Sequence, residues 1–357
     1  MADLMKSTTT YQKLVSQYGN FVVPAMKIKV NGQDTITSMN LHVAELSVVV
    51  SVKAAGYAVI KIDSGYDYEK TAFQSNMKDK FKPGTVVSVE IGYLSHTECI
   101  FKGYVAMVGV ELSDTRYFVV TLMDARRLMI TSGKKHILHD VKNYSDAFQA
   151  VIGNYSKLCT AKIDATKDQL EQPVSQISSD YDFITKELAR KGKREFFIFA
   201  DKAYYRKLDE STSPVMTLKY GRELYELKVD YEYVDAKIKV LGYDQGKEES
   251  ISFEKPVKSI LAQTSIMTTP EYVVVDGDAD TKEKAQNRAE FLARQEWMRT
   301  CTGRGKTIGI PELVPGRYVA IEGVDPMVNK KYYLTEVKHS IVAMEFTTEF
   351  EIGGVSG

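Results

Sequence analysis

The sequence has few of the features that mark exported, metal-binding or membrane-spanning proteins. Its three cysteines, Cys99, Cys159 and Cys301, are odd in number and far apart, so they favour neither a disulfide framework nor a local CxxC metal site. We expect reduced thiols that fill the core. The longest apolar run, 46–52, is far shorter than the roughly twenty residues that a membrane helix needs. No segment is therefore expected to span a bilayer.

Net charge is also missing. The 47 basic and 47 acidic side chains balance, which argues against the basic surface that nucleic-acid or anionic-membrane binding usually requires. The N-terminus has no continuous apolar core and carries Asp3 where an export signal is positively charged, so no signal peptide is expected. Tyrosine is abundant, with 22 residues against 14 Phe and one Trp, which suits side chains shared between a core and an interface.

What is present first is a run of short strands over about 125 residues. Segments rich in Val, Ile, Phe and Tyr alternate with Gly, Ser and Asp, which is typical of a β domain. The first segment ends in Asn31-Gly32, the dipeptide best suited to positive φ in a tight hairpin turn. The expected strands cover 21–30, 45–52, 58–62, 85–91, 97–110 and 116–123.

From about residue 124 the hydrophobic pattern changes to that of helices. Ser145 is expected to cap one helix, and Ser179 or Asp180 to cap a second one that ends at Gly192. An aromatic strand, 195–200, follows directly. The pattern therefore predicts a small α/β domain.

A second β segment, 215–253, is followed by one clear helix. Asp280 with Glu283 three residues later resembles a capping box, and the helix is expected to end near Thr300. Strands resume over 314–352.

One strand pattern occurs twice. Residues 83–90 and 315–322 share Pro-Gly-x-x-Val-x-[Val/Ile]-Glu, and 101–105 aligns with 333–337 at the same offset. Chance similarity is one explanation, because strands draw on a narrow set of residues. We favour a duplicated β domain whose second copy is split by a helical insertion.

The segment 303–307, Gly-Arg-Gly-Lys-Thr, looks like part of a phosphate-binding loop. The glycine that the motif requires five positions before Gly305 is Thr300, and the segment follows a helix, whereas the motif needs strand, loop and helix in that order. We therefore expect a solvated loop and no nucleotide.

Three histidines are also weak candidates for a site. His136 and His139 are three residues apart, but neighbouring lysines and the lack of further local ligands argue against a metal, so we expect surface or polar-interface residues. His339 lies in an expected strand and is predicted to be a hydrogen-bonded structural residue.

The acidic residues give no specific site. Asp276, Asp278 and Asp280 alternate like the start of a calcium loop, but Thr281 stands where that loop needs glycine, so helix capping is the preferred interpretation. Adjacent acids such as Glu248 and Glu249 are expected in any chain this acidic, and no Gly-x-Ser-x-Gly elbow occurs. We predict no catalytic, cofactor-binding or metal-binding residues.

Several segments, in a fixed order, carry a family resemblance. They are the two Pro-Gly strands, the helix 176–192 with the aromatic strand after it, the helix 280–300 and the closing strands 332–350. Together they resemble the phage late control protein D and VgrG hub family over nearly the whole chain.

That resemblance implies a structural protein and not an enzyme. In the family, two related barrel domains per subunit form a homotrimeric, pseudo-six-fold ring that joins the six-fold tail tube to the three-fold spike. DNA or cargo then passes through the lumen without specific binding, and other baseplate proteins are further partners. The sequence ends at Gly357, directly after the last expected hub strand, so we expect the spike to be a separate polypeptide.

The predicted fold class is therefore α+β and β-dominated, with two homologous antiparallel β-barrel domains. The expected division is 1–125 for the first barrel, 126–210 for the α/β domain, 211–275 and 311–357 for the second barrel, and 276–310 for the helical insertion. The expected location is the baseplate of a phage tail or phage-tail-like particle assembled in the bacterial cytoplasm. A peptidoglycan hydrolase of the baseplate and a carbohydrate-binding β protein are the alternatives.

Overall fold

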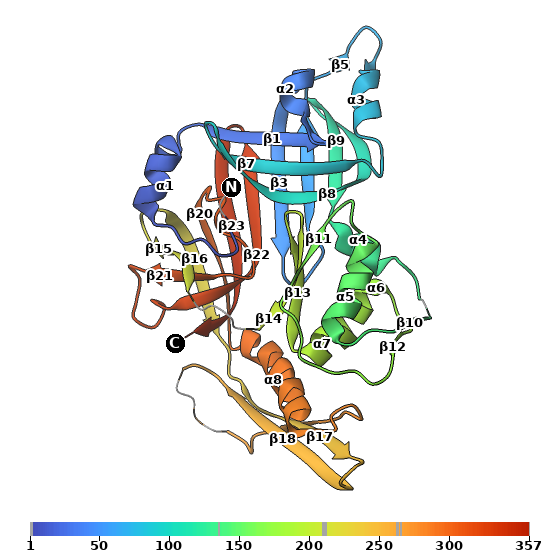
Figure 1. The fold of residues 1–357 in the computed structure, drawn as a ribbon. Helices are drawn as coiled ribbons and strands as arrows, with labels where there is room; N and C mark the ends of the chain where they lie inside the picture. The colour runs from blue at the N-terminus through green and yellow to red at the C-terminus, as the bar shows by residue number, and fades with distance from the viewer. Residues whose placement is uncertain (1–2, 135, 209–212, 262–263, 265, 357) are drawn as a thin grey trace.

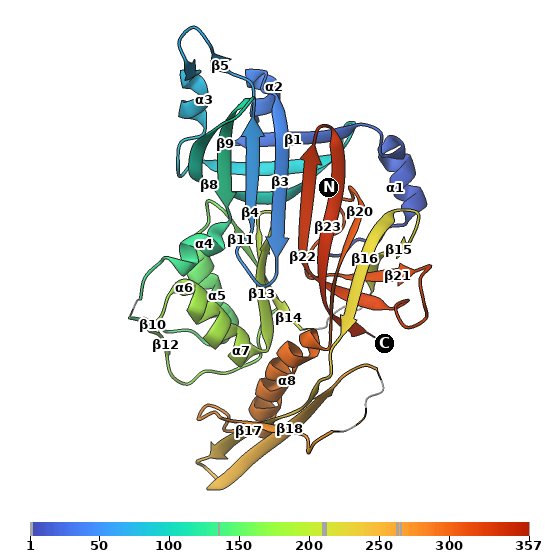
Figure 2. The same ribbon diagram turned by 180° about the vertical axis from the view of Figure 1, so that it is seen from behind.

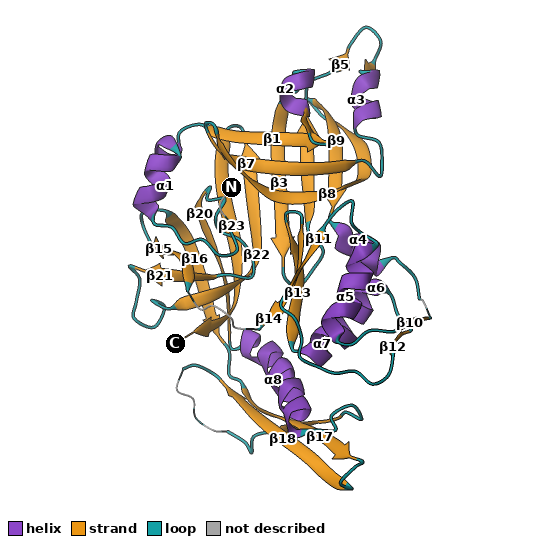
Figure 3. Cartoon of the chain, in the orientation of Figure 1, coloured by secondary structure: helices purple, strands orange, loops and turns teal. Residues whose placement is uncertain are grey.

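The computed structural model describes residues 3–134, 136–208, 213–261, 264 and 266–356 (Figure 1). Strands dominate, and most of them run antiparallel (Figure 3), which confirms the β-dominated prediction. The expected boundary between 210 and 211, and the last residue, Gly357, lie outside the described residues. None of the described helices has the length and apolar character needed to cross a bilayer.

The first half contains the strands expected from the sequence. Asn31 and Gly32 adopt φ values of 50° and 85° and join Val30 to its partner Gln33, so the predicted tight turn is present. The first half also contains two short helices and a small two-stranded hairpin between its main strands. These elements are α2 (Thr35–Met39), β5 (Tyr66–Asp67), β6 (Ala72–Phe73) and α3 (Ser75–Lys80). The strands are β1 (Pro24–Val30), β2 (Gln33–Asp34), β3 (Val43–Ser51), β4 (Tyr57–Ile62), β7 (Val86–Tyr93), β8 (His96–Leu112) and β9 (Arg116–Met123).

The second half repeats the strand order of the first. The first half reads β3-β4-β9-β8-β7-β1 and the second reads β16-β20-β23-β22-β21-β15. One pairing differs, because β1 is antiparallel to β7 whereas β15 is parallel to β21. The strands of the second half are β15 (Pro214–Lys219), β16 (Leu224–Tyr231), β20 (Cys301–Ile308), β21 (Tyr318–Glu322), β22 (Lys331–Val342) and β23 (Glu345–Ser356).

Irregularities in the strand pairing also repeat. The β3–β4 ladder shifts register between Val43 and Glu45, and the β16–β20 ladder shifts between Leu224 and Glu226. The β8–β9 and β22–β23 ladders likewise shift at equivalent places, between 105 and 107 and between 334 and 336. Chance likeness of two hairpins does not account for six strands in one order with matching bulges. The repeat predicted from the Pro-Gly strands is therefore present in the topology.

The sequence alignment of this repeat was wrong in its second part. The N–H of Gly84 donates to the carbonyl of Val105, and the N–H of Gly316 donates to the carbonyl of Leu334, both at 2.8 Å. Val105 is thus equivalent to Leu334, and not to Val337 as the sequence alignment had it. The reason is that the whole hairpin is three residues shorter in the second half: Val86 pairs with Tyr104, but its equivalent Tyr318 pairs with Tyr333. Local sequence patterns do not record that difference.

Each half has two layers of strands with the apolar core between them. β1 and β7 lie on one side of the first half and β3, β4 and β9 on the other, while the long strand β8 runs through both layers (Figures 1 and 2). β22 pairs with β3 through seven residue pairs, from Glu336 opposite Ser51 to Val342 opposite Glu45. The strands β9-β4-β3-β22-β23-β20-β16, with residues 106–112 of β8 beside β9, therefore form one layer, called here the continuous layer. Among the described residues no strand pairing closes either half into a ring, so the barrel form of the prediction is not confirmed.

The N-terminal segment packs on the second half although it precedes the first. It contains α1 (Tyr11–Gln17) and the 3-10 turn η1 (Gly19–Phe21). Arg317 donates to the carbonyl of Leu4 at 2.7 Å, and the hydroxyl of Tyr18 donates to Glu312 at 2.7 Å. This segment therefore ties the two halves together.

A small α/β unit follows the first half and has a core of its own. Its first long helix is capped by Asn143, which accepts from the N–H of Asp146 at 2.9 Å, so the prediction of Ser145 as the cap was wrong. Ser179 caps the next helix as predicted. The elements are α4 (Ala125–Ile130), β10 (Ile137–His139), α5 (Tyr144–Gly153), β11 (Thr160–Ile163), β12 (Val174–Gln176), α6 (Asp180–Asp182), η2 (Phe183–Leu188), α7 (Ala189–Gly192), β13 (Arg194–Phe199) and β14 (Lys202–Lys207).

A separate sheet and helix are inserted between β16 and β20. Thr281, and not Asp280, caps the helix by accepting from the N–H of Lys284 at 3.2 Å. The sequence had placed all three strands of this sheet in the second β domain and β20 in the insertion. The pairing instead puts the three strands in a sheet of their own and β20 in the second half. The exact domain boundaries stay a prediction. The inserted elements are β17 (Asp235–Asp244), β18 (Glu249–Lys258), β19 (Glu271–Val275) and α8 (Lys282–Arg299).

Candidate functional site

The segment 303–307 lies inside β20, between β16 and β23. A Cβ atom at Gly305 would lie 2.3 Å from Cζ of Phe350, so the glycine lets the strand pass over an aromatic ring. The expected solvated loop was therefore wrong, because cross-strand packing with a distant residue explains the glycine. A paired strand does not offer the row of free N–H groups that cradles a phosphate.

The two histidines of the α/β unit have different surroundings. His139 lies on β10, where Nε2 is 2.9 Å from Oε1 of Gln176 and the ring stacks on Phe183 at 5.1 Å between centroids. His136 is exposed. His136 at the surface and His139 beside the polar side chain of Gln176 agree with the prediction of surface or polar-interface residues.

His339 is a core residue of β22. Its Nδ1 lies 2.9 Å from Oγ1 of Thr348, and burial lowers the pKa of the imidazole to about 3. The ring is therefore neutral at any physiological pH and serves as a hydrogen-bonded structural residue, as predicted.

The alternating aspartates before α8 each contact a cation. Oδ2 of Asp276 is 2.7 Å from Nε of Arg288, Asp278 is 2.5 Å from Lys191, and Asp280 is 2.6 Å from Lys284. Within the part of the chain that the structure describes, no cluster of three or more His, Cys, Asp or Glu is arranged to hold a metal ion.

The three cysteines are free, with Cys159 and Cys301 buried and Cys99 half-buried. Burial raises the pKa of Cys99 to about 11 and that of Cys159 and Cys301 to about 12. They are thus poor nucleophiles at neutral pH, since the thiolate is the reactive form.

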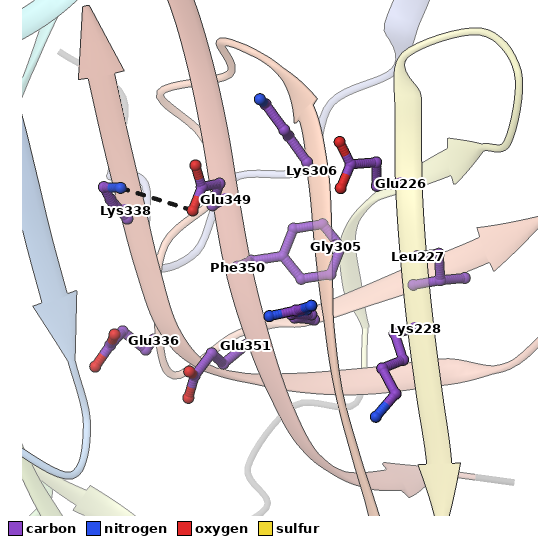
Figure 4. Close-up of a pocket in the computed structure, with 11 residues that line it drawn as sticks. Glu226, Leu227, Lys228, Gly305, Lys306, Glu336, Lys338, Glu349, Phe350 and Glu351 are labelled. Atoms are coloured by element: carbon purple, nitrogen blue, oxygen red, sulfur yellow. Dashed lines mark ion pairs between the residues drawn. The ribbon is translucent and has the colours of Figure 1, made fainter.

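One face of the second half is lined with charges (Figure 4). Four strands of the continuous layer contribute two residues each, and alternation along the strands places them on the face opposite the core. The set, called here the charged face, is Glu226 and Lys228 of β16, Arg304 and Lys306 of β20, Glu349 and Glu351 of β23, and Glu336 and Lys338 of β22.

The eight residues of the charged face are four acids and four bases. Nζ of Lys338 is 3.7 Å from Oε2 of Glu349 across the two strands. Partial burial, together with the neighbouring Glu351, raises the pKa of Glu336. The charged face therefore carries side chains of both signs next to one another.

Two strand edges at opposite ends of the continuous layer have no partner among the described residues. Beyond Val105, β8 pairs only with β9, so residues 106–112 leave the other edge open. Leu224 of β16 also bridges to Tyr220, but residues 226–231 pair only with β20, so the outer edge of β16 is open over those residues. Sequence reasoning missed both edges, although a dense run of apolar residues at a strand end, Met107, Val108, Val110 and Leu112, was a signal.

Solved structures with a similar fold come from tails and from a secretion system. A tail protein from Neisseria meningitidis MC58 is 13% identical, with a TM-score of 0.69 over 93% of this chain and 96% of that one. The 43 kDa tail protein of prophage MuSo2 from Shewanella oneidensis is 11% identical, with a TM-score of 0.68 over 93% and 100%. The E. coli c3393 protein, a component of the type VI secretion system, is 11% identical, with a TM-score of 0.56 over 92% and 77%. The fold is therefore that of phage-tail-like proteins.

A family model described as the Alg8 N-terminal domain matches residues 21–343, which is most of the chain. The protein belongs to this family. The description of this family names a domain and no reaction. The family differs from the hub family that the sequence resembles. No curated protein sequence matches this chain.

Proposed function

We propose that this protein is a non-enzymatic, structural hub in the baseplate of a phage tail or phage-tail-like particle. The observation that carries the proposal is the duplicated six-strand unit, in which both copies share one continuous layer. The fold shared with tail proteins is consistent with it.

The duplication supports a symmetry-matching role. Two similar units in one chain, repeated in three copies of the chain, present six similar surfaces to a six-fold tube and keep three-fold symmetry toward a spike. A chain without an internal repeat offers only three such surfaces as a trimer. The homotrimer and the pseudo-six-fold ring are therefore part of the proposal.

The charged face supports a role as the wall of a lumen. The second strand layer and the α/β unit cover the other side of the continuous layer, and Figure 2 views that layer from the side away from β1 and β7. The uncovered side is thus the one available to line a ring. Balanced charges suit the passage of DNA or cargo without tight binding.

The proposed partners are a tail tube protein, a spike protein and other baseplate proteins. A chain of the PdpA–VgrG complex of Francisella has a similar fold, with a TM-score of 0.54 at 12% identity over 93% of this chain and 58% of that one. A protein of this fold is thus found in a complex with another protein, and we extend that property to this chain.

Light scattering on the purified full chain tests the proposal. We expect a mass of three chains at high protein concentration, and an image of the assembled particle should place the protein on the axis between tube and spike. A strict monomer at every concentration contradicts the hub. Clearing of purified peptidoglycan by the chain alone would instead favour a hydrolase.

A further inference from the structure

We propose that the open edge of β8 pairs, antiparallel, with the outer edge of β16 in a second copy of this chain. The register runs from Val108 opposite Tyr231 to Leu112 opposite Leu227. This inference rests on the proposed hub function and names the contact between subunits that the hub requires.

The contact that β22 makes with β3 inside one chain is the template for this pairing. The matching bulges make residues 107–112 of β8 equivalent to 336–341 of β22, and 226–231 of β16 equivalent to 45–50 of β3. In the second half, the edge of β22 that corresponds to the open edge of β8 is covered by β3. Within one chain no strand covers the corresponding edge of β8 in the first half. The equivalent of β3 in the second half is β16, and the outer edge of β16 is open.

Burial shows that the first half lacks a neighbouring strand. Val108, Val110 and Leu112 are 41%, 54% and 70% exposed. Their equivalents on β22, Val337, His339 and Ile341, are 1%, 2% and 2% exposed. Contacts inside the second half, such as those of His339 with Thr348 and Phe346, contribute to this difference. The missing strand beside β8 is expected to account for the rest. An exposed apolar strand edge of this kind is a site where another chain pairs.

The outer edge of β16 carries the complementary residues. Tyr231, Val229 and Leu227 pack against the core on the same face and are only partly buried. Their equivalents on β3, Val50, Val48 and Leu46, are buried. The proposed register sets these three side chains opposite Val108, Val110 and Leu112, so two apolar rows meet.

The other face of the proposed pair is also complementary. Glu111 comes opposite Lys228, which places opposite charges side by side. Both are exposed in the single chain, where Glu111 lies 3.2 Å from Lys61 and Lys228 lies 2.7 Å from Asp230. A slip of one residue would remove this match and turn the apolar side chains of β8 to the wrong face.

The two edges lie at opposite ends of the continuous layer, as Figures 1 and 2 both show. Pairing β8 of one copy with β16 of the next is therefore a head-to-tail contact. Such a contact builds a ring when the rotation between copies closes.

Paired cysteines test the register in the full chain. With Val110→Cys and Val229→Cys in the same protein, we expect mild oxidation to give disulfide-linked chains on a non-reducing gel. The pair Glu111→Cys with Lys228→Cys tests the other face of the strands. Directly opposite residues of an antiparallel pair are close enough for a disulfide at either kind of position.

A slipped pair is the matched control. Val110→Cys with Lys228→Cys uses the same strands but sets the thiols on opposite faces, so no cross-link is expected. Each variant with a single added cysteine shows how much cross-linking arises from the native thiols of Cys99, Cys159 and Cys301. All the substituted positions are exposed or half-buried, and thermal unfolding checks that each variant folds.

The outcomes separate this inference from the hub function. Cross-linking of both in-register pairs without the slipped pair supports it. A trimer by light scattering that forms no in-register cross-link overturns the strand pairing and leaves the hub standing. A cross-link through the slipped pair overturns the register, and a monomer that never cross-links contradicts both proposals.

Discussion

A buried carboxyl group, Glu312, joins the N-terminal segment to the second half. It accepts the hydroxyl hydrogen of Tyr18, and burial raises the pKa of Glu312 from 4.5 to about 7. Because the folded pKa lies above the unfolded one, the protonated carboxyl contributes its full stability below pH 4.5. That contribution is lost as the pH rises from 4.5 to about 7.

Glu312→Gln should remove this pH dependence. The amide keeps an acceptor for Tyr18 but does not ionise, so the free energy of unfolding above pH 7 should rise by roughly 3 kcal/mol relative to the native chain. Urea denaturation between pH 5 and pH 8 measures it, with Glu345→Gln at an exposed position as the control. Equal pH profiles for Glu312→Gln and the native chain would show that the carboxyl does not titrate in this range.

The repeated Pro-Gly turns offer a matched pair of substitutions. Gly84 and Gly316 have φ values of 88° and 81°, so alanine is strained at both by about 1 kcal/mol. A Cβ at Gly84 meets nothing within 4 Å, whereas at Gly316 it would lie 2.8 Å from Cζ of Phe197. We expect Gly316→Ala to lower the free energy of unfolding by a further 1 to 3 kcal/mol or so beyond Gly84→Ala. Denaturant titration of the two variants compares them, and equal losses would contradict the crowding argument.

At the scale of elements, a buried ion pair holds α4 against the turn between β3 and β4. Asp124 caps α4, accepts from the N–H of Gly56 at 2.7 Å, and lies 2.7 Å from Nη2 of Arg126. Arg126 in turn donates to the carbonyl of Ser51 at 2.6 Å. Both charged side chains are almost completely buried.

Asp124→Ala should be strongly destabilising, by roughly 3 to 5 kcal/mol, since it leaves a buried guanidinium without its counter-ion. Asp182→Ala, which breaks the exposed Asp182–Lys186 pair, is the control and should change little. Thermal unfolding of both variants gives the comparison. Similar losses would mean that solvent reaches Arg126 in the folded protein.

The open edge of β8 gives a prediction about assembly. Val110→Asp adds a charge to an exposed position, so the single chain should unfold at nearly the native temperature, while the mass by light scattering should fall toward one chain. Val275→Asp, at an exposed position on β19, should alter neither property. An unchanged mass for Val110→Asp would argue that this edge lies outside the subunit contact.

At the scale of the whole molecule, the proposed contacts are main-chain hydrogen bonds and apolar pairs. Only one ion pair, Glu111 with Lys228, belongs to the proposed strand pairing, and the chain carries no net charge. The assembled form should therefore persist when salt is raised from about 0.1 M to about 1 M, which shortens the screening length to roughly 3 Å. Light scattering at the two salt concentrations measures this. Dissociation at high salt would point to charged surfaces as the subunit contacts.

The sequence by itself determined the local structure of this protein. Alternating apolar residues marked the strands of the first half, Asn31-Gly32 marked its first turn, and the two Pro-Gly strands marked the repeat. It also gave the structural role of His339. These features depend on the spacing at which side chains return to the same face of a strand or helix, and on backbone conformations that single residues favour. A short stretch of chain is therefore enough to show them.

Only the tertiary structure decided which distant segments meet. It gave the three-residue offset between Val105 and Leu334, put β17 and β18 with α8, and placed β20 over Phe350. It also left the edges of β8 and β16 open. Strand pairing depends on burial between residues far apart in the chain, and many registers satisfy one alternating pattern, so the folded chain alone selects among them.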